Sequence, residues 1–218
     1  MEPEKTPSNL SKKDVYIKNL DIFRELGNIC AGGAGNILSK LIKKKIYFDI
    51  PPAKYLSISQ IIKGRLIENQ KQMCLHGTIK GFFQGKIFLM TPIDETEILL
   101  ENLYKVKKKA EIKKNQNFNS NDNQILHNFF KKLINAYTDA LASFLQVSLM
   151  FDEEQFITKQ GSDFKSCVAS TTDEELNKAI TIETTIKVEN EEIIHCSFLF
   201  ILGSSEVDTI LNRIEEIW

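Results

Sequence analysis

The sequence predicts an α+β fold built from two copies related by a pseudo-two-fold axis, in which two long helices, one from each copy, pack on an antiparallel β-sheet. Apolar residues recur at helical spacing from Asp14 to about Leu41 and again over residues 123–146. Short apolar segments follow each long helix, and an amphipathic segment closes each half. The same order of elements, met twice, indicates one fold built from two copies.

The first half is expected to cover about residues 14–105, after a flexible tail at 1–13 that is rich in Pro, Ser, Lys and Glu. Its elements are predicted at 14–41 for the helix, which the glycines could interrupt, at 45–50 and 54–62 for short strands, at 72–81 with 85–91 for a hairpin, and at 93–104 for the closing helix. Pro92 stands where the first residue of that closing helix belongs.

A segment rich in Lys and Asn, at about 106–122, lacks apolar periodicity and is predicted to be a linker inside a single domain of residues 14–218. The second half then covers about 123–218. Its elements are predicted at 123–146 for a helix, 147–151 and 164–170 for strands, 178–188 with 193–202 for a hairpin, and 204–217 for a last helix.

An offset of 103 residues brings the two halves into register. Leu38 then meets Leu141, Leu41 meets Phe144, and the letters YFD at 47–49 meet MFD at 150–152. Coincident residue types at one offset are the signature of an internal repeat.

Composition narrows the possible partners and compartment. The formal net charge is −1, which favours neither nucleic acid nor an anionic membrane as a partner. The longest apolar run, CSFLFIL at 196–202, is far too short to span a bilayer. Four dispersed cysteines and a polar start without an apolar leader segment predict a cytoplasmic protein with free thiols.

Three polar residues form a stripe on the first long helix. Asp21, Glu25 and Asn28 stand at positions i, i+4 and i+7, which share one helical face. The neighbouring stripe is apolar and is expected to face the core; it consists of Ile22, Leu26 and Ile29. A carboxylate and a carboxamide one turn apart on a rigid helix are suited to gripping a cation and aiming a water.

These residues resemble the motif of a known family. The spacing of Asp21, Glu25, Asn28 and Pro51 fits the pattern Asp/Ser-x3-Glu-x2-Asn-x22-Pro of the bacterial chemotaxis phosphatases CheC, CheX and FliY. The flanking letters ELGNICAGGAGNILSKLIKKKIYFDIP also resemble the family's helix and following strand. The duplicated order of elements favours the CheC type, because CheX carries one helix motif per chain and FliY adds a switch-protein region.

The resemblance implies a phosphatase that acts on the aspartyl phosphate of a CheY-type response regulator. Asn28 would orient the attacking water and Glu25 would pair with a lysine of the regulator, while Asp21 and Pro51 would support the helix and the chain direction. The regulator would bring its own Mg²⁺, so no cofactor or metal site of the chain itself is expected. A CheD-type receptor deamidase is a further partner that the resemblance implies.

The second copy lacks every residue of the motif. At the offset of 103 the four motif positions fall on Gln124, Asn128, Lys131 and Glu154. One working site is therefore predicted, together with a degenerate second helix that serves architecture or another partner.

Other interpretations of these features remain open. The polar stripe could be an ordinary solvated helix face, or the chain could be a non-catalytic docking module similar to the flagellar switch protein FliM. The glycine run completes neither common phosphate-binding motif and instead predicts close helix packing. Cys74 with His76, and His195 with Cys196, match no usual zinc spacing, and both histidines are expected in or near the core.

Overall fold

The computed structural model describes residues 12–49, 54–57, 60, 71–106, 118–159, 168, 178–188 and 193–217. In chain order the elements of the described residues are α1 (Lys12–Ile42), β1 (Ile46–Asp49), β2 (Lys54–Ser57), β3 (Gln72–Gly81), β4 (Gly85–Pro92), α3 (Ile93–Val106), α4 (Ser120–Leu145), β5 (Leu149–Lys159), β6 (Lys178–Val188), β7 (Ile193–Leu202) and α6 (Ser204–Ile217).

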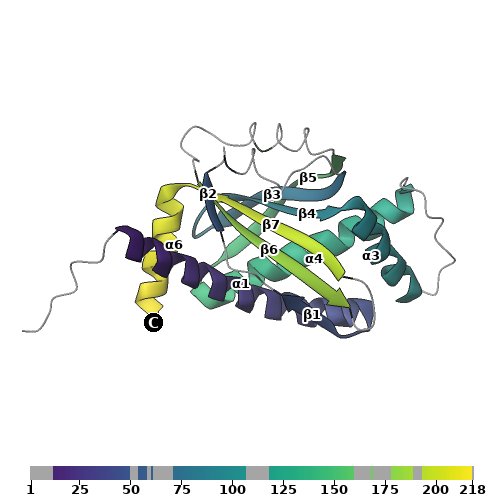
Figure 1. Ribbon diagram of the computed structural model, residues 1–218, viewed down its shortest axis with the longest axis horizontal. Helices are drawn as coiled ribbons and strands as arrows, with labels where there is room; N and C mark the ends of the chain where they lie inside the picture. Colours follow the sequence, from purple (N-terminus) through teal and green to yellow (C-terminus); the bar gives the residue numbers. More distant parts are fainter. Residues whose placement is uncertain are drawn as a thin grey trace, which may run out of the picture.

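The strands form one antiparallel sheet, and the two halves exchange strands within it (Figure 1). The strand order is β1-β6-β7-β4-β3-β5, with β2 also paired to β6. Strand β1 of the first half therefore pairs with the hairpin of the second half, through Asp49 and Thr185 among others. Strand β5 of the second half pairs with the hairpin of the first half, as Phe151 opposite Ile79 shows.

A pseudo-two-fold axis runs between β4 and β7, the two central strands. Their register places Phe88 opposite Leu199, two residues that are 111 positions apart in the sequence. The first residues of α3 and α6, Ile93 and Ser204, are also 111 positions apart, so the same offset relates the two halves here. The first residues of β1 and β5, Ile46 and Leu149, differ by 103. The predicted duplicated α+β fold is thus confirmed, with extra residues in the second half between its first strand and its closing helix.

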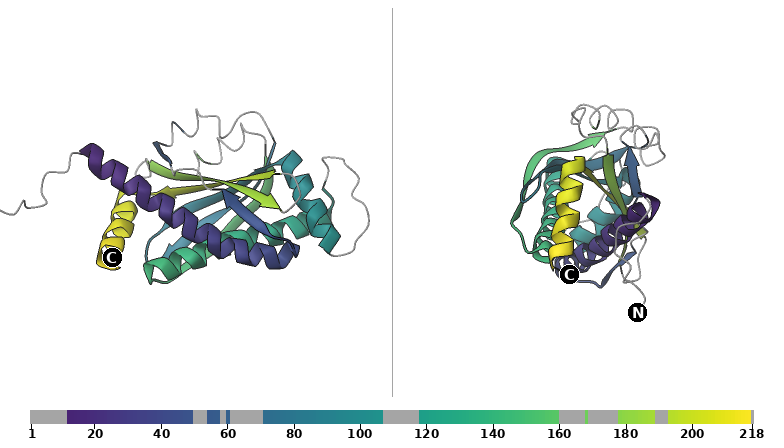
Figure 2. Two further views of the ribbon diagram at one scale, coloured as in Figure 1. Left: turned by 60° about the horizontal axis from the view of Figure 1, so that its bottom comes forward. Right: turned by 90° about the vertical axis from the view of Figure 1, so that its left-hand side faces the viewer.

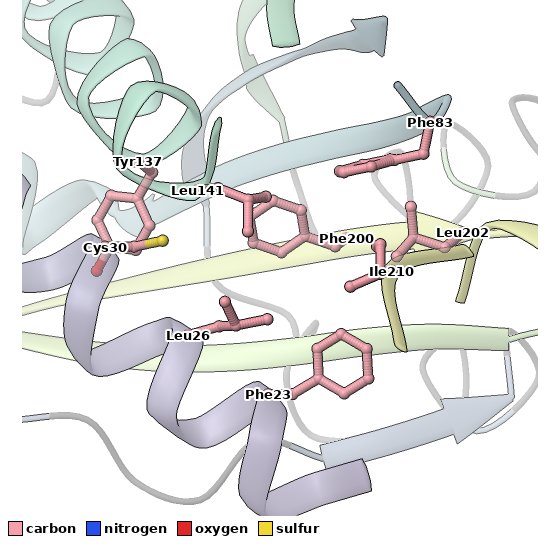
Figure 3. A pocket seen from close by; sticks show the side chains of 9 residues that line it. All are labelled: Phe23, Leu26, Cys30, Phe83, Tyr137, Leu141, Phe200, Leu202 and Ile210. Atoms are coloured by element: carbon pink, nitrogen blue, oxygen red, sulfur yellow. The ribbon is translucent and has the colours of Figure 1, made fainter. Parts of the chain in front are cut away.

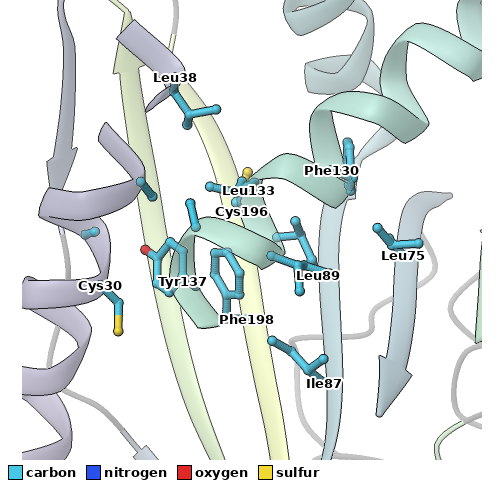
Figure 4. Close-up of a cluster of buried hydrophobic side chains, with 14 of the residues drawn as sticks. Cys30, Leu38, Leu75, Ile87, Leu89, Phe130, Leu133, Tyr137, Cys196 and Phe198 are labelled. Carbon is cyan, nitrogen blue, oxygen red and sulfur yellow. The ribbon is translucent and has the colours of Figure 1, made fainter. Parts of the chain in front are cut away.

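The long helices α1 and α4 pack against each other and cover one face of the sheet, while α3 and α6 lie at opposite ends (Figures 1 and 2). The core fills the space between these helices and the sheet. At its centre Tyr137 of α4 stacks on Phe198 of β7, with ring centroids 4.0 Å apart (Figure 4). Full burial of such side chains contributes roughly 1.5–3 kcal/mol each and fixes the two helices on the sheet.

Helix α1 passes through its glycines without a break, and two of them allow close packing. A methyl group at Gly33 would lie 3.2 Å from the Cβ of Ala140 on α4, and one at Gly35 would lie 3.2 Å from the ring of Phe48 on β1. Gly32 is different, because a methyl group there would meet nothing within 4 Å. Close packing therefore explains Gly33 and Gly35 but leaves Gly32 unexplained.

The core stripe of α1 differs in phase from the predicted one. Leu26 is buried as expected, but Ile22 and Ile29 are only partly buried. The buried stripe is instead made of Phe23, Leu26, Cys30, Ala34 and Leu38. The reason is that α1 faces both the sheet and α4, so small residues such as Ala34 are buried where the two helices meet, and size does not predict burial there.

Some element boundaries differ from the predicted ones. Helix α4 begins at Ser120, three residues earlier than expected, because Asn119 and Asp122 form a capping box at its N-terminus. Strand β5 continues to Lys159, since β3 provides a long partner, with a β-bulge opposite His76 and Gly77. Pro92 is the last residue of β4 and not the first of α3.

Certain expectations fall outside the described residues. These are the tail at 1–11, Pro51, most of the linker at 107–117, and the predicted strand at 164–170 apart from the buried Val168. No helix in the described part of the chain is long and apolar enough to cross a membrane.

Candidate functional site

Glu25 and Asn28 lie on the outer face of α1, opposite the residues that anchor the helix. Both side chains are exposed, whereas Leu26 and Cys30 of the same turns are buried. The amide Nδ2 of Asn28 donates a hydrogen bond to Oε2 of Glu25 at 3.4 Å. The structure thus brings the two predicted catalytic residues together on one surface. Asp21 belongs to the same helix, but its side chain is outside the described part, as is Pro51.

The hydrogen bond between the Asn28 carboxamide and the Glu25 carboxylate is weak. At 3.4 Å the hydrogen bond is longer than the usual 2.7–3.2 Å, and solvent reaches both groups. Such a bond is easily exchanged for a bond to an incoming molecule, because little free energy is lost when it breaks. The pair is therefore presented for contact and is not locked into a structural role.

A groove begins at Asn28 and runs between α1 and β1, with a volume of about 360 Å³. Its lining residues are Asn28, Ala31, Gly32, Gly35, Asn36, Ser39, Ile46, Tyr47 and Phe48. At the far end Ser39 Oγ accepts a hydrogen bond from the backbone N–H of Ile46 at 3.3 Å, which ties the start of β1 to the helix. The sequence motif does not predict this groove. The small residues that follow Asn28, namely Ala31, Gly32 and Gly35, are the signal for it in the sequence.

The chemistry that this surface can perform is positioning. The described residues that line the groove have neutral side chains, and none of them is a cysteine, histidine or lysine that could act as a nucleophile or base. Among the described residues no group of His, Cys, Asp and Glu is arranged to hold a metal ion. An amide can both donate to and accept from a water molecule, and a carboxylate can accept from a cationic side chain.

The corresponding surface of α4 holds an ion-pair network. Gln124, Asn128 and Lys131 are exposed there, as the repeat predicts. Lys131 Nζ lies 2.9 Å from Oε2 of Glu153 on β5, and Nε2 of His127 lies 2.5 Å from Oε1 of the same carboxylate. Burial alone would raise the pKa of Glu153, but the hydrogen bonds from Lys131 and His127 outweigh it and lower that pKa.

The two strand histidines differ in burial, contrary to the prediction that both lie in or near the core. His76 is buried and stacks on Phe88, with ring centroids 5.1 Å apart. His195 is exposed, and its Nδ1 lies 2.9 Å from Oε1 of Glu95 on α3. Alternation along β7 explains the difference, because the neighbouring Cys196 takes the buried face.

A second hollow lies on the inner side of α1 and is apolar. It has a volume of about 40 Å³ and is enclosed by α1, α4, β7, α6 and the tip of the first hairpin (Figure 3). Phe23, Leu26 and Cys30 line it from α1, and Phe83 closes it from the hairpin. The described residues that line it are apolar apart from the Tyr137 hydroxyl and the Cys30 thiol, so it is a packing defect of the core, on the opposite side of α1 from Glu25 and Asn28.

Comparison with known proteins finds similarity to a group of chemotaxis proteins. No family model matches the chain. The chain is 27% identical over 86 residues to the CheY-P phosphatase CheC of Bacillus subtilis, a match that covers 39% of this chain and 41% of that protein. The similarity therefore spans about two fifths of the curated relative.

Solved structures show the same fold over nearly the whole chain. FliY of Thermotoga maritima superposes with a TM-score of 0.74 at 10% identity, covering 96% of this chain and 99% of that one. The FliM middle domain of H. pylori superposes with a TM-score of 0.59 at 9% identity, covering 94% and 99%. Because FliY shares the fold so completely, the duplication does not by itself separate a CheC type from FliY. The chain is thus similar to CheC in part of its sequence and to FliY and the FliM middle domain in its fold, and Glu25 and Asn28 stand at the spacing of the motif of the CheC, CheX and FliY phosphatases.

Proposed function

We propose that the chain accelerates hydrolysis of the aspartyl phosphate of a CheY-type response regulator, with Asn28 orienting the water and Glu25 docking the regulator. The observation that carries the proposal is the pairing of Glu25 and Asn28, exposed together on one face of a helix whose other face is buried. The B. subtilis relative is a CheY-P phosphatase, which supports the choice of substrate.

Positioning is sufficient for this reaction. Phosphoryl transfer passes through a loose transition state, so the main requirements are a water in line with the phosphorus and neutralisation of the phosphoryl oxygens. The regulator would supply the acyl phosphate and its Mg²⁺, and no cofactor of the chain itself is proposed. Asn28 would hold the water through its carbonyl oxygen while its amide group points toward the phosphoryl oxygens.

Glu25 has a different part in the proposal. Its carboxylate would leave the long bond to Asn28 and accept a charge-assisted hydrogen bond from a lysine beside the regulator's phosphorylated aspartate. That exchange would free the Asn28 amide group for the phosphoryl oxygens at the moment of docking, with the Asn28 carbonyl oxygen turned to the water. Regulator binding and water positioning would then be coupled through one hydrogen bond.

Substitution of Asn28 by alanine tests the proposal. B. subtilis CheY is first phosphorylated with a small-molecule phosphodonor, and the wild-type chain should accelerate the loss of its phosphate. Asn28→Ala should reduce that acceleration on the order of 100-fold, while binding to CheY is maintained. Asn128→Ala makes the same chemical change on the exposed face of α4 and should leave turnover unchanged. Undiminished turnover by Asn28→Ala would reject the assigned role.

A docking module without catalysis is the second candidate function. The likeness to the FliM middle domain favours it, because that fold is shared at a TM-score of 0.59. It predicts stable binding of the phosphorylated regulator with no faster decay, so the same assay separates the two candidates. Retention of both Glu25 and Asn28 favours catalysis.

Two further expectations belong to this proposal. A cytoplasmic location follows from a response regulator as substrate. A CheD-type deamidase is proposed as a second partner on the resemblance to CheC alone, and co-elution of the two purified proteins on a sizing column would test it. Separate elution at micromolar concentration would remove that partner.

A further inference from the structure

We propose that the groove between α1 and β1 receives a short extended segment of the regulator's backbone next to the phosphorylated aspartate, so that it is the specificity subsite of the reactive surface. The inference rests on the proposed function, because it takes the same regulator as the occupant. It assigns a role to residues outside the phosphatase motif, chiefly Gly32 and Asn36.

Continuity with the reactive pair is the first support. Asn28 itself lines the mouth of the groove, so any protein that brings an acyl phosphate to Asn28 must place neighbouring residues over or into this hollow. Asn36 lies eight residues further along α1, about 12 Å at the helical rise of about 1.5 Å per residue. An extended chain covers that distance with about four residues.

The lining chemistry indicates what kind of segment fits. The groove has neutral walls: the exposed carboxamides of Asn28 and Asn36 lie along α1, and Tyr47 of β1 is 54% exposed on the other side. Carboxamides match the donor and acceptor of a peptide group, whereas a charged side chain would lose hydration there without an ionic partner. A backbone segment with small or apolar side chains is therefore the expected occupant.

The second half of the molecule provides an internal comparison. At the offset of 103, the small residues Ala31, Gly32 and Gly35 correspond to larger ones, namely Ile134, Asn135 and Thr138, of which Ile134 and Thr138 are buried. The ion pair between Lys131 and Glu153 also joins α4 to β5 at this place. Small side chains thus accompany the complete motif, and large side chains with an ion pair accompany the degenerate one.

Gly32 is the residue that keeps the groove open without a structural need for glycine. A side chain at this position would start in open space, with no heavy atom within 4 Å of its Cβ, so the helix tolerates it. Glycine inside a helix is also unfavourable relative to alanine, and close packing does not account for it here. The space that Gly32 leaves in the groove for a bound segment accounts for the glycine at this position.

The experiment is to fill the groove with Gly32→Leu and to measure both turnover and binding. With phosphorylated B. subtilis CheY, KM should rise at least about tenfold while kcat at saturation stays within about twofold, because the plug removes docking and leaves Asn28 in place. The dissociation constant for beryllofluoride-activated CheY should rise by the same factor. Asn36→Ala, which removes one hydrogen-bonding group, should raise KM by about threefold to tenfold.

Asn135→Leu is the matched control, since it places the same side chain at the position of α4 that the repeat relates to Gly32. It should leave KM unchanged. Wild-type KM in Gly32→Leu, or a loss of kcat with unchanged KM, would overturn the inference while the proposed function stands. If the wild type binds CheY without speeding decay, the proposed function fails, and the binding constants of Gly32→Leu and Asn135→Leu alone decide the inference. Absence of both binding and turnover in the wild type would overturn both.

Discussion

Adjacent glycines of α1 should respond in opposite ways to the same substitution. Gly32→Ala places a methyl group in open space, and Gly33→Ala places one 3.2 Å from the Cβ of Ala140 on α4. Both changes gain the same intrinsic helix propensity, about 1 kcal/mol relative to glycine. The difference between the two variants therefore reports the packing of α1 on α4.

The magnitude follows from the distance. Carbon atoms pack best at about 3.5–4.0 Å, so the added methyl at Gly33 is too close by several tenths of an ångström and the two helices must separate. Overpacking of this kind costs about 1–3 kcal/mol, which offsets the propensity gain or exceeds it. We expect Gly32→Ala to raise the free energy of unfolding by about 1 kcal/mol and Gly33→Ala to leave it unchanged or to lower it by up to about 2 kcal/mol.

Urea unfolding followed by circular dichroism measures both variants against the wild type, with equal m-values as the condition for comparison. The double variant Gly33→Ala with Ala140→Gly removes the contact from the other side and should show favourable coupling of about 1 kcal/mol or more. Equal stabilisation by Gly32→Ala and Gly33→Ala would show that α1 and α4 are not packed as closely as the structure has them.

Two further predictions concern titratable groups. The pKa of Glu153 is lower in the fold than in the unfolded chain, so its stabilisation is present above about pH 4.5 and is lost as the pH falls. Lys131→Met should shrink the difference in unfolding free energy between pH 7 and pH 4 by about 0.2–1 kcal/mol, because Lys131 is half exposed and solvent screens its charge; an unchanged difference would contradict the network. Burial raises the pKa of Cys30 and of Cys196 to about 12. Cys167, which lies outside the described residues, is first replaced by serine. The native Cys167→Ser protein should then react with a thiol reagent at pH 8 far more slowly than the same protein unfolded in urea, and labelling of the native protein within minutes would refute this burial.

Local patterns in the sequence predicted the elements well. Apolar spacing identified α1 and α4, and the glycines on either side of Phe82 and Phe83 identified the first hairpin with its strands 72–81 and 85–92. These features depend on residues close in sequence, so their signals are visible there. The capping box of Asn119 is a local signal, but it lies within a run of Lys and Asn residues that indicates a linker, so the start of α4 is predicted too late.

Long-range features could not be predicted in the same way. The exchange of β1 and β5 between the halves depends on pairings between residues at least 68 positions apart, for which the repeat gives no register. The phase of the buried stripe, centred on Phe23 and Cys30, depends on how α1 meets α4. The motif predicted Glu25 and Asn28 as candidates, and the structure adds their mutual contact and the groove beside them.

The exchanged strands make the two halves dependent on each other for folding. A fragment ending at Val106 would contain β1 without β6 and the β3–β4 hairpin without β5, and a fragment starting at Phe118 would have the reciprocal defect. Each fragment alone would expose open sheet edges and aggregate, whereas the two mixed together should reconstitute the native protein. The half without the motif thus supplies the strand partners that the half with the motif needs in order to fold, and the rate of folding should be limited by forming these distant pairings.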